Sequence, residues 1–239
     1  MLQRDDLLAP LIETLQKQDN ILAVWEGGAA AFNRLDEWSD IDLQAVVRDD
    51  AVEQTFAVIE QALLSLSPLD TVYAIPQPSW HGHAQKFYRL RDASPFLLVD
   101  VAIIRESSTS SKFLEPDIHG QAKVHFDRAG IINSSAPLDR RAFAHLLWKR
   151  VNDLRITFPL FQAMILKEVY RGNAIDALAF YQNLTLAPLV EILRMTYAPF
   201  HYNFRSRYLY HELPQDIVDQ LEKLYFIANL DDLHKKQQE

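Results

Sequence analysis

Residues 21–47 read ILAVWEGGAAAFNRLDEWSDIDLQAVV, in which two apolar runs enclose a glycine pair and an Asp-x-Asp motif. The first run ends at Gly27-Gly28, so we expect a strand that turns where glycine allows unusual backbone angles. The second run starts at Ser39-Asp40-Ile41-Asp42 and continues through Val47, which indicates another strand. The segment therefore predicts two strands, with a glycine turn after the first.

The Asp-x-Asp motif places two carboxylates on one side of the second strand. Residues i and i+2 of a strand face the same way, so Asp40 and Asp42 are expected roughly 7 Å apart along it. Like charges at this spacing favour a bound cation, and carboxylate oxygens suit Mg²⁺ or Mn²⁺, which also bind substrate phosphates. The structural alternative is a solvated strand start, since Asp-x-Asp alone is a common motif.

The glycine pair suggests an anion site beside these carboxylates. Gly27 and Gly28 allow backbone N–H groups to approach a phosphate closely. The run Ala29 to Ala31 can continue as a short helix, whose N-terminal dipole would add to phosphate binding. Glycines, carboxylates and their spacing together favour a nucleotide site over either motif read alone.

This pattern resembles the polymerase-β-like nucleotidyltransferase superfamily, particularly the small bacterial aminoglycoside and lincosamide nucleotidyltransferases. Family members carry a third carboxylate on a later strand, and Asp100 within the apolar run Phe96 to Ile104 matches it. An aspartate there is costly to bury without a partner, although an edge-strand position or a salt bridge would also explain it. The chain departs from the family's Gly-Ser at Gly27-Gly28, so a serine contact to phosphate is missing while backbone contacts remain.

The resemblance implies an Mg²⁺-dependent (or Mn²⁺-dependent) enzyme that transfers a nucleoside monophosphate from ATP, or another NTP, to a hydroxyl of a small-molecule acceptor. The acceptor class includes antibiotics, and pyrophosphate is released. The implied metal ligands are Asp40, Asp42 and Asp100. The implied nucleotide-binding residues are Gly27, Gly28, Arg34, Asp40 and Asp42. Asp100 and Glu168 are the two candidate catalytic bases.

The order of elements predicts an α+β fold with a mixed sheet in residues 1–135 and an all-helical domain in residues 136–239. The expected helices of the first part are 5–15 and 50–64, and the expected strands are 21–25, 39–47, 71–75, 85–90 and 96–104. Beyond Ser134 the apolar residues recur at helical spacing, punctuated by Pro159, Gly172 and Pro188. We expect a last helix over 216–229 and a frayed tail over 235–239.

Composition narrows the classes of partner. The net charge of −8 opposes attraction to a nucleic-acid backbone, so no nucleic-acid partner is expected. No apolar run reaches the roughly 20 residues that span a bilayer, and the first residues lack a signal-peptide pattern. With no cysteine in the chain, we expect a cytoplasmic protein that does not bind membranes. A homodimer stays open.

Several alternatives remain at the level of sequence. A non-catalytic nucleotide sensor or a toxin–antitoxin component could keep the same fold, and a helical interaction module would carry its acidic residues incidentally. His81 and His83 are expected in a turn rather than in a metal site, because no supporting ligand spacing accompanies them. The tyrosines and phenylalanines between Tyr197 and Tyr210 could line an acceptor pocket or pack against the helices.

Overall fold

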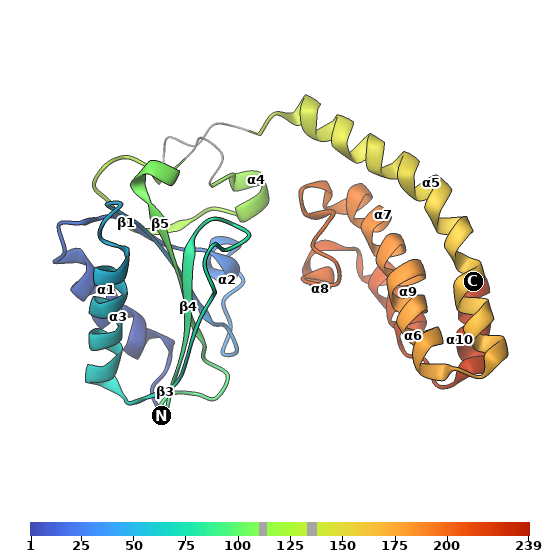
Figure 1. Ribbon diagram of the computed structural model, residues 1–239, viewed down its shortest axis with the longest axis horizontal. Helices are drawn as coiled ribbons and strands as arrows, with labels where there is room; N and C mark the ends of the chain where they lie inside the picture. The colour runs from blue at the N-terminus through green and yellow to red at the C-terminus, as the bar shows by residue number, and fades with distance from the viewer. Residues whose placement is uncertain (110–113, 133–137) are drawn as a thin grey trace. The chain divides into compact units, whose positions relative to one another are not determined.

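The computed structural model describes residues 1–109, 114–132 and 138–239. The chain forms two compact units, residues 1–138 and 139–239, which are described separately (Figure 1). The expected division between residues 135 and 136 lies three residues before this boundary.

The first unit is a mixed sheet with helices, as expected from the order of elements. The sheet runs β3-β4-β5-β2-β1-β6, and only β2 and β5 pair in parallel among its described strands. Its strands are β1 (Ile21–Glu26), β2 (Ile41–Val47), β3 (Leu69–Ala74), β4 (Ala84–Leu90), β5 (Val99–Arg105) and β6 (Lys123–Asp127). Its helices are α1 (Arg4–Gln16), α2 (Gly28–Ala31), α3 (Val52–Leu66), the short 3₁₀ turn η1 (Glu106–Ser108) and α4 (Pro116–His119).

Alternation along β2 and β5 decides which face is buried. Ile41 and Leu43, with Val99 and Val101 beside them, join the apolar faces of α1 and α3 in one core (Figure 1). The intervening residues therefore point to the opposite face, which is covered at one end where Leu114 joins a second apolar cluster. Asp42 and Asp100 lie on this opposite face.

Strand β6 was not predicted from the sequence. It reads KVHFD, a five-residue alternation in which only Val124 and Phe126 are apolar, and among the described strands it pairs with β1 alone. Its residues are half-buried or exposed, as is usual for an edge strand. The alternation is short and contains only two apolar residues, so it is a weak signal in the sequence, and the backbone pairing with β1 stabilises the strand.

The second unit is helical, as expected, and Pro159, which was expected either to divide a helix or to kink it, does not divide its longest helix. Pro159 lies inside the continuous helix α5 (Arg140–Arg171), whereas Gly172 ends it in the left-handed conformation with φ of 75°. The remaining segments are α6 (Ala174–Tyr181), a π-helical turn η3 (Gln182–Leu186), α7 (Ala187–Tyr197), η4 (Pro199–His201), α8 (Leu209–Glu212), α9 (Gln215–Tyr225) and α10 (Leu230–Gln238). Pro188 lies in the first turn of α7, where proline is tolerated.

The end of the chain corrects two predictions. The single helix expected over 216–229 ends at Tyr225, and all but the last residue of the tail expected to be frayed belongs to α10. The Asn229 side chain accepts a hydrogen bond from the backbone N–H of Asp232, and Leu233 is buried. An N-terminal cap and one apolar anchor thus stabilise a terminal helix that its polar composition concealed.

None of the helices in the described ranges is both long and apolar enough to span a bilayer.

Candidate active site

Asp42 and Asp100 lie side by side on the face of the sheet away from α1 and α3. They are direct partners in the parallel pairing of β2 with β5, flanked by buried aliphatic residues on both strands. Neighbouring strands are about 4.8 Å apart, so the two half-buried carboxylates project next to each other. The sequence predicted each aspartate, and the strand register brings these two together.

Both carboxyl groups bind protons more tightly than usual. Burial raises the pKa of Asp42, as does the charge of Asp40, while the charge of Arg4 opposes them. Burial raises the pKa of Asp100 to about 6; hydrogen bonds from Gln85 lower it, and the charges of Asp42 and Asp40 raise it further. A pair of carboxylates in this environment is stabilised by a bound cation or by a shared proton.

Asp40 stands immediately before β2 and is held by the segment that leads into β5. Its Oδ1 atom accepts a hydrogen bond of 2.9 Å from the backbone N–H of Leu98. This hydrogen bond links the residue that precedes β2 to the residue that precedes β5. The structure brings Asp40 close enough for its charge to raise the pKa of both other carboxyl groups.

The glycine turn lies directly against Asp42. The Gly27 N–H donates to the Asp42 carbonyl over 2.9 Å, and Gly28 has φ of 51°, in the left-handed region. A Cβ atom on Gly28 would lie 1.8 Å from Asp42 Oδ2. Glycine at this position thus leaves room for the Asp42 carboxylate, which is a physical reason for the departure from Gly-Ser.

Gln85 is a site residue that the sequence analysis missed. Its Nε2 atom donates to both carboxylate oxygens of Asp100, at 2.6 and 2.8 Å, from the neighbouring strand β4. The alternating character of β4 could have shown which side chains face Asp100, but only after the pairing of β4 with β5 was known. Gln85 fixes the orientation of the Asp100 carboxylate.

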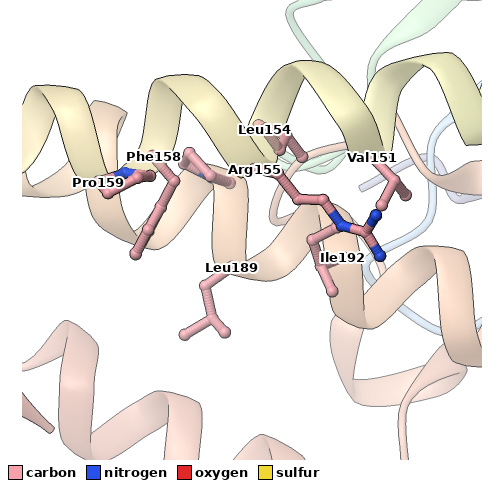
Figure 2. A pocket seen from close by; sticks show the side chains of 8 residues that line it. Val151, Leu154, Arg155, Phe158, Pro159, Leu189 and Ile192 are labelled. Carbon is pink, nitrogen blue, oxygen red and sulfur yellow. The ribbon is translucent and has the colours of Figure 1, made fainter.

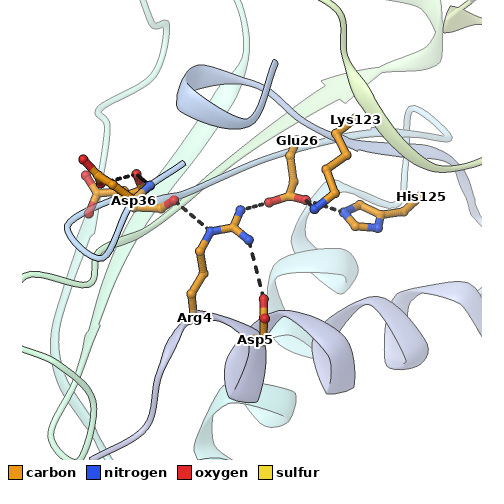
Figure 3. A network of polar contacts seen from close by, with 8 residues as sticks. Arg4, Asp5, Glu26, Asp36, Lys123 and His125 are labelled. Carbon is orange, nitrogen blue, oxygen red and sulfur yellow. Dashed lines mark hydrogen bonds and ion pairs between the residues drawn. The ribbon is translucent and has the colours of Figure 1, made fainter. Parts of the chain in front are cut away.

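A buried ion cluster around Glu26 lies at the ends of α1 and β1 (Figure 3). Glu26 has no exposed surface and accepts a hydrogen bond from Arg4, while Lys123 Nζ and His125 Nε2 approach its Oε1 atom at 3.2 and 3.0 Å. Arg4 Nε also donates to the Asp40 carbonyl over 3.4 Å. In the sequence, the only sign of this cluster is Glu26 at the end of the apolar run of residues 21–25, and no role was predicted for it.

Arg34 follows the glycine turn in the segment that leads to Asp40. Its guanidinium lies 4.9 Å from the centre of the Phe32 ring, and its backbone N–H donates to the Ala29 carbonyl. The structure therefore keeps Arg34 in the same connection as the glycines. Its predicted role in nucleotide binding stays a prediction.

Glu168 belongs to the second unit and is already engaged there. It is 9% exposed and accepts hydrogen bonds from Asn173 Nδ2 at 2.7 Å and Arg171 Nη1 at 2.6 Å. These bonds, with that from Asn173 the largest cause, lower the pKa of its carboxyl group. The side chain stabilises the C-terminal end of α5, and its role as a base stays a prediction.

The second unit also contains an apolar pocket of about 540 Å³ between α5 and α7 (Figure 2). The pocket is lined by Val151, Leu154, Arg155, Phe158, Pro159, Pro188, Leu189 and Ile192. Arg155 is the one charged side chain in this lining. Of the aromatic residues between Tyr197 and Tyr210, Phe204 stacks on His201 at 4.4 Å and Phe200 lies beside Phe143. Tyr202 and Tyr210 line two other cavities of the unit.

Two of the predicted metal ligands supply oxygen donors that a divalent metal could bind. Within residues 1–109, 114–132 and 138–239, no three acidic, histidine or cysteine side chains form a ready-made metal cluster. Asp42 and Asp100 nevertheless supply adjacent oxygen donors, and burial raises the pKa of both carboxyl groups. These residues fit a hard cation. His81 and His83 lie in the connection between β3 and β4, as expected.

Comparison with protein-family models and with curated proteins finds no match for this chain. The interpretation of the site therefore rests on its residues and their geometry.

Proposed function

We propose that this protein is a nucleotidyltransferase that transfers a nucleoside monophosphate from ATP, or another NTP, to a hydroxyl of a small molecule. The observation that carries the proposal is the position of Asp42, with the Gly28 backbone against its carboxylate and Asp100 beside it on the next strand. Phosphate-binding backbone and cation-binding carboxylates are thereby contiguous. This combination supports nucleotide chemistry better than either feature alone.

Different residues of the first unit are proposed to bind the metal ion and the phosphates of the nucleotide. Asp40 and Asp42 are the proposed ligands of Mg²⁺ or Mn²⁺, and the Gly27-Gly28 backbone would seat the phosphates. Asp100 would either complete a second metal position or accept the proton of the acceptor hydroxyl. When bound, the cation would supply positive charge that stabilises the transferring phosphate and the pyrophosphate leaving group. Arg34 is the proposed additional cation near the phosphates.

Asp100 is the preferred base. The acceptor oxygen forms a bond to the α-phosphorus, the bond between the α-phosphorus and its bridging oxygen breaks, and pyrophosphate leaves with that electron pair. The hydroxyl proton passes to Asp100, which lies beside Asp42 on the neighbouring strand of the same face. Gln85 keeps the receiving carboxylate oriented.

The acceptor would be a small molecule, with an antibiotic such as an aminoglycoside as one candidate. The chain carries a net charge of −8, which is compatible with a cationic acceptor. Acceptor binding by the helical unit is part of the proposal, for which the apolar pocket between α5 and α7 offers a binding surface. A cytoplasmic location and the absence of a nucleic-acid partner stay predictions.

The proposal is tested by incubating the protein with Mg²⁺, each NTP, and a panel of aminoglycosides and lincosamides. Mass detection should find an acceptor that has gained one nucleoside monophosphate, together with released pyrophosphate. The product should be lost in Asp42→Asn and retained in Asp50→Asn, which changes an exposed aspartate after β2. Equal transfer by Asp42→Asn and the wild type would exclude this site.

A nucleotide sensor is the second candidate function. Its support is that Leu98 and Gln85 already donate hydrogen bonds to Asp40 and Asp100. Such a protein would bind Mg²⁺ and nucleotide at the same residues without transferring any group. Nucleotide binding without product across the panel would favour this candidate.

A further inference from the structure

Two aromatic residues continue the line of the carboxylates across the sheet. Tyr73 on β3 pairs with Phe87 on β4, Phe87 pairs with Asp100 on β5, and Asp100 pairs with Asp42 on β2. Directly paired residues face the same side of a sheet, so the four side chains form a row on one face. The contact of Gln85 with Asp100 agrees with this, because Gln85 and Phe87 are two residues apart on β4 and therefore face the same side.

Tyr73 and Phe87 form a stacked pair, here called the aromatic shelf. Their ring centres are 6.2 Å apart and the rings are inclined by 23°. Tyr73 is 57% exposed, so the shelf presents apolar surface to solvent at one end of the row. Phe87 begins the shelf one strand, or about 5 Å, from Asp100.

The geometry of the proposed reaction indicates which end of the row faces the nucleotide phosphates and which end faces the acceptor. In an in-line displacement, the attacking oxygen and the leaving pyrophosphate lie on opposite sides of the phosphorus. The phosphate-binding glycines lie against Asp42, at one end of the row. The acceptor hydroxyl must then approach from the Asp100 side, and the rest of the acceptor extends towards the aromatic shelf.

We propose that the aromatic shelf of Tyr73 and Phe87 binds a ring of the acceptor, next to the hydroxyl that Asp100 deprotonates. This inference rests on the proposed function and narrows its substrate to cyclic alcohols whose ring presents a flat face. Aromatic side chains provide rigid surface for such stacking. The shelf would therefore contact the part of the acceptor next to the reacting hydroxyl and leave the nucleotide to the glycines and carboxylates.

Titration calorimetry separates these roles. The protein is loaded with Mg²⁺ and α,β-methylene ATP, a non-hydrolysable analogue, and titrated with kanamycin, lincomycin, the aromatic alcohol tyrosol, or open-chain sorbitol. Tyr73→Ser is compared with Val72→Ser, which changes a 45% exposed residue of the same strand whose side chain points to the other face. Binding of the analogue itself is measured in each variant.

We expect Tyr73→Ser to weaken binding of at least one ring-bearing probe about tenfold, the size of a lost stacking contact, without changing the Kd of the analogue. Val72→Ser should change neither, and sorbitol should bind more weakly than the rings. Comparing tyrosol with the two antibiotics shows whether the favoured ring is aromatic or sugar-like.

Three results would overturn the inference while leaving the proposed function standing. The first is an equal change in probe binding by Tyr73→Ser and Val72→Ser. The second is weaker binding of the analogue to Tyr73→Ser, which would place the nucleobase on the shelf. The third is that no ring-bearing probe binds to the loaded protein. Failure of the wild type to bind the analogue would instead contradict the proposed function itself.

Discussion

At the scale of single residues, the site is defined by carboxylates that the fold buries next to one another, which disfavours their ionised forms. Asp42 and Asp100 sit side by side, and burial raises both pKa values. Glycine at position 28 leaves room for one of these carboxylates. Two predictions concern these residues, one from protonation and one from backbone geometry.

The first prediction is that Asp100→Asn stabilises the metal-free protein at high pH. The folded-state pKa of about 6 exceeds the ordinary aspartate value of 3.8, so the stabilising contribution of protonated Asp100 is complete below about pH 4 and is lost as pH rises through 6. The variant should therefore have a higher free energy of unfolding than the wild type at pH 8, by about 1 kcal/mol after allowance for solvent screening, and should unfold at a higher temperature. Near pH 4 the advantage should shrink.

Thermal unfolding at both pH values checks this prediction, and Mg²⁺ provides its control. Added Mg²⁺ should raise the midpoint of the wild type at pH 8 more than that of Asp100→Asn. An equal effect of the substitution at pH 4 and pH 8 would show that the charge on Asp100 is not responsible.

The second prediction concerns Gly28→Ala. The new Cβ atom would meet the Asp42 carboxylate, and alanine is disfavoured at φ of 51°, so we expect a loss of about 1 kcal/mol in stability and about tenfold weaker Mg²⁺–nucleotide binding. Gly172→Ala is the matched control, because Gly172 has φ of 75° with open space around its Cβ position. Urea unfolding and calorimetry should show strain in both variants but weaker binding only in Gly28→Ala.

At the scale of elements, apolar periodicity predicted the strands that have long apolar runs and missed an element whose pattern is short. β2 was predicted over 39–47 and is observed over Ile41–Val47, whereas β6 was missed because the alternation in KVHFD is short and has only two apolar residues. Pro159 does not interrupt α5, and α10 is fixed by the Asn229 cap, which polar composition hid. Local sequence therefore gave the elements with strong patterns and not those that depend on tertiary contacts.

The third prediction concerns the junction of α1, β1 and β6. Arg4→Met removes a guanidinium that binds buried Glu26 and the Asp40 carbonyl, leaving Glu26 with only Lys123 and His125 among the described bases around it. Loss of one partner of a buried ion pair should cost about 3 kcal/mol in the free energy of unfolding.

Urea unfolding measures this loss against Lys17→Met, which breaks the exposed pair with Glu13. The control should cost about 0.5 kcal/mol or less. Similar losses in the two variants would mean that the cluster around Glu26 does not stabilise the junction.

At the scale of the whole molecule, the chain divides into a unit that holds the candidate nucleotide site and a helical unit that contains Glu168. The sequence could predict Asp40, Asp42 and Asp100 from their patterns, because an aspartate within an apolar run is conspicuous. It could not predict Gln85, Tyr73 or Phe87 as neighbours of the site, since those depend on the antiparallel register of β3, β4 and β5.

The fourth prediction separates the two units. Glu168→Gln should lower the stability of the helical unit, because Arg171 and Asn173 lose a charged acceptor, yet leave Mg²⁺–nucleotide binding unchanged. Calorimetry with an NTP and thermal unfolding measure the two effects. A large loss of transfer with normal stability would instead make Glu168 the base.

The most direct test of the account is calorimetric titration of ATP into the wild type and Asp42→Asn, with Mg²⁺ and with EDTA. We predict one nucleotide site that requires Mg²⁺ and is lost in Asp42→Asn while the circular dichroism spectrum of the variant stays native. ATP binding that persists in EDTA, or that is equal in folded Asp42→Asn, would contradict the assignment of a metal-dependent nucleotide site to Asp42 and its neighbours.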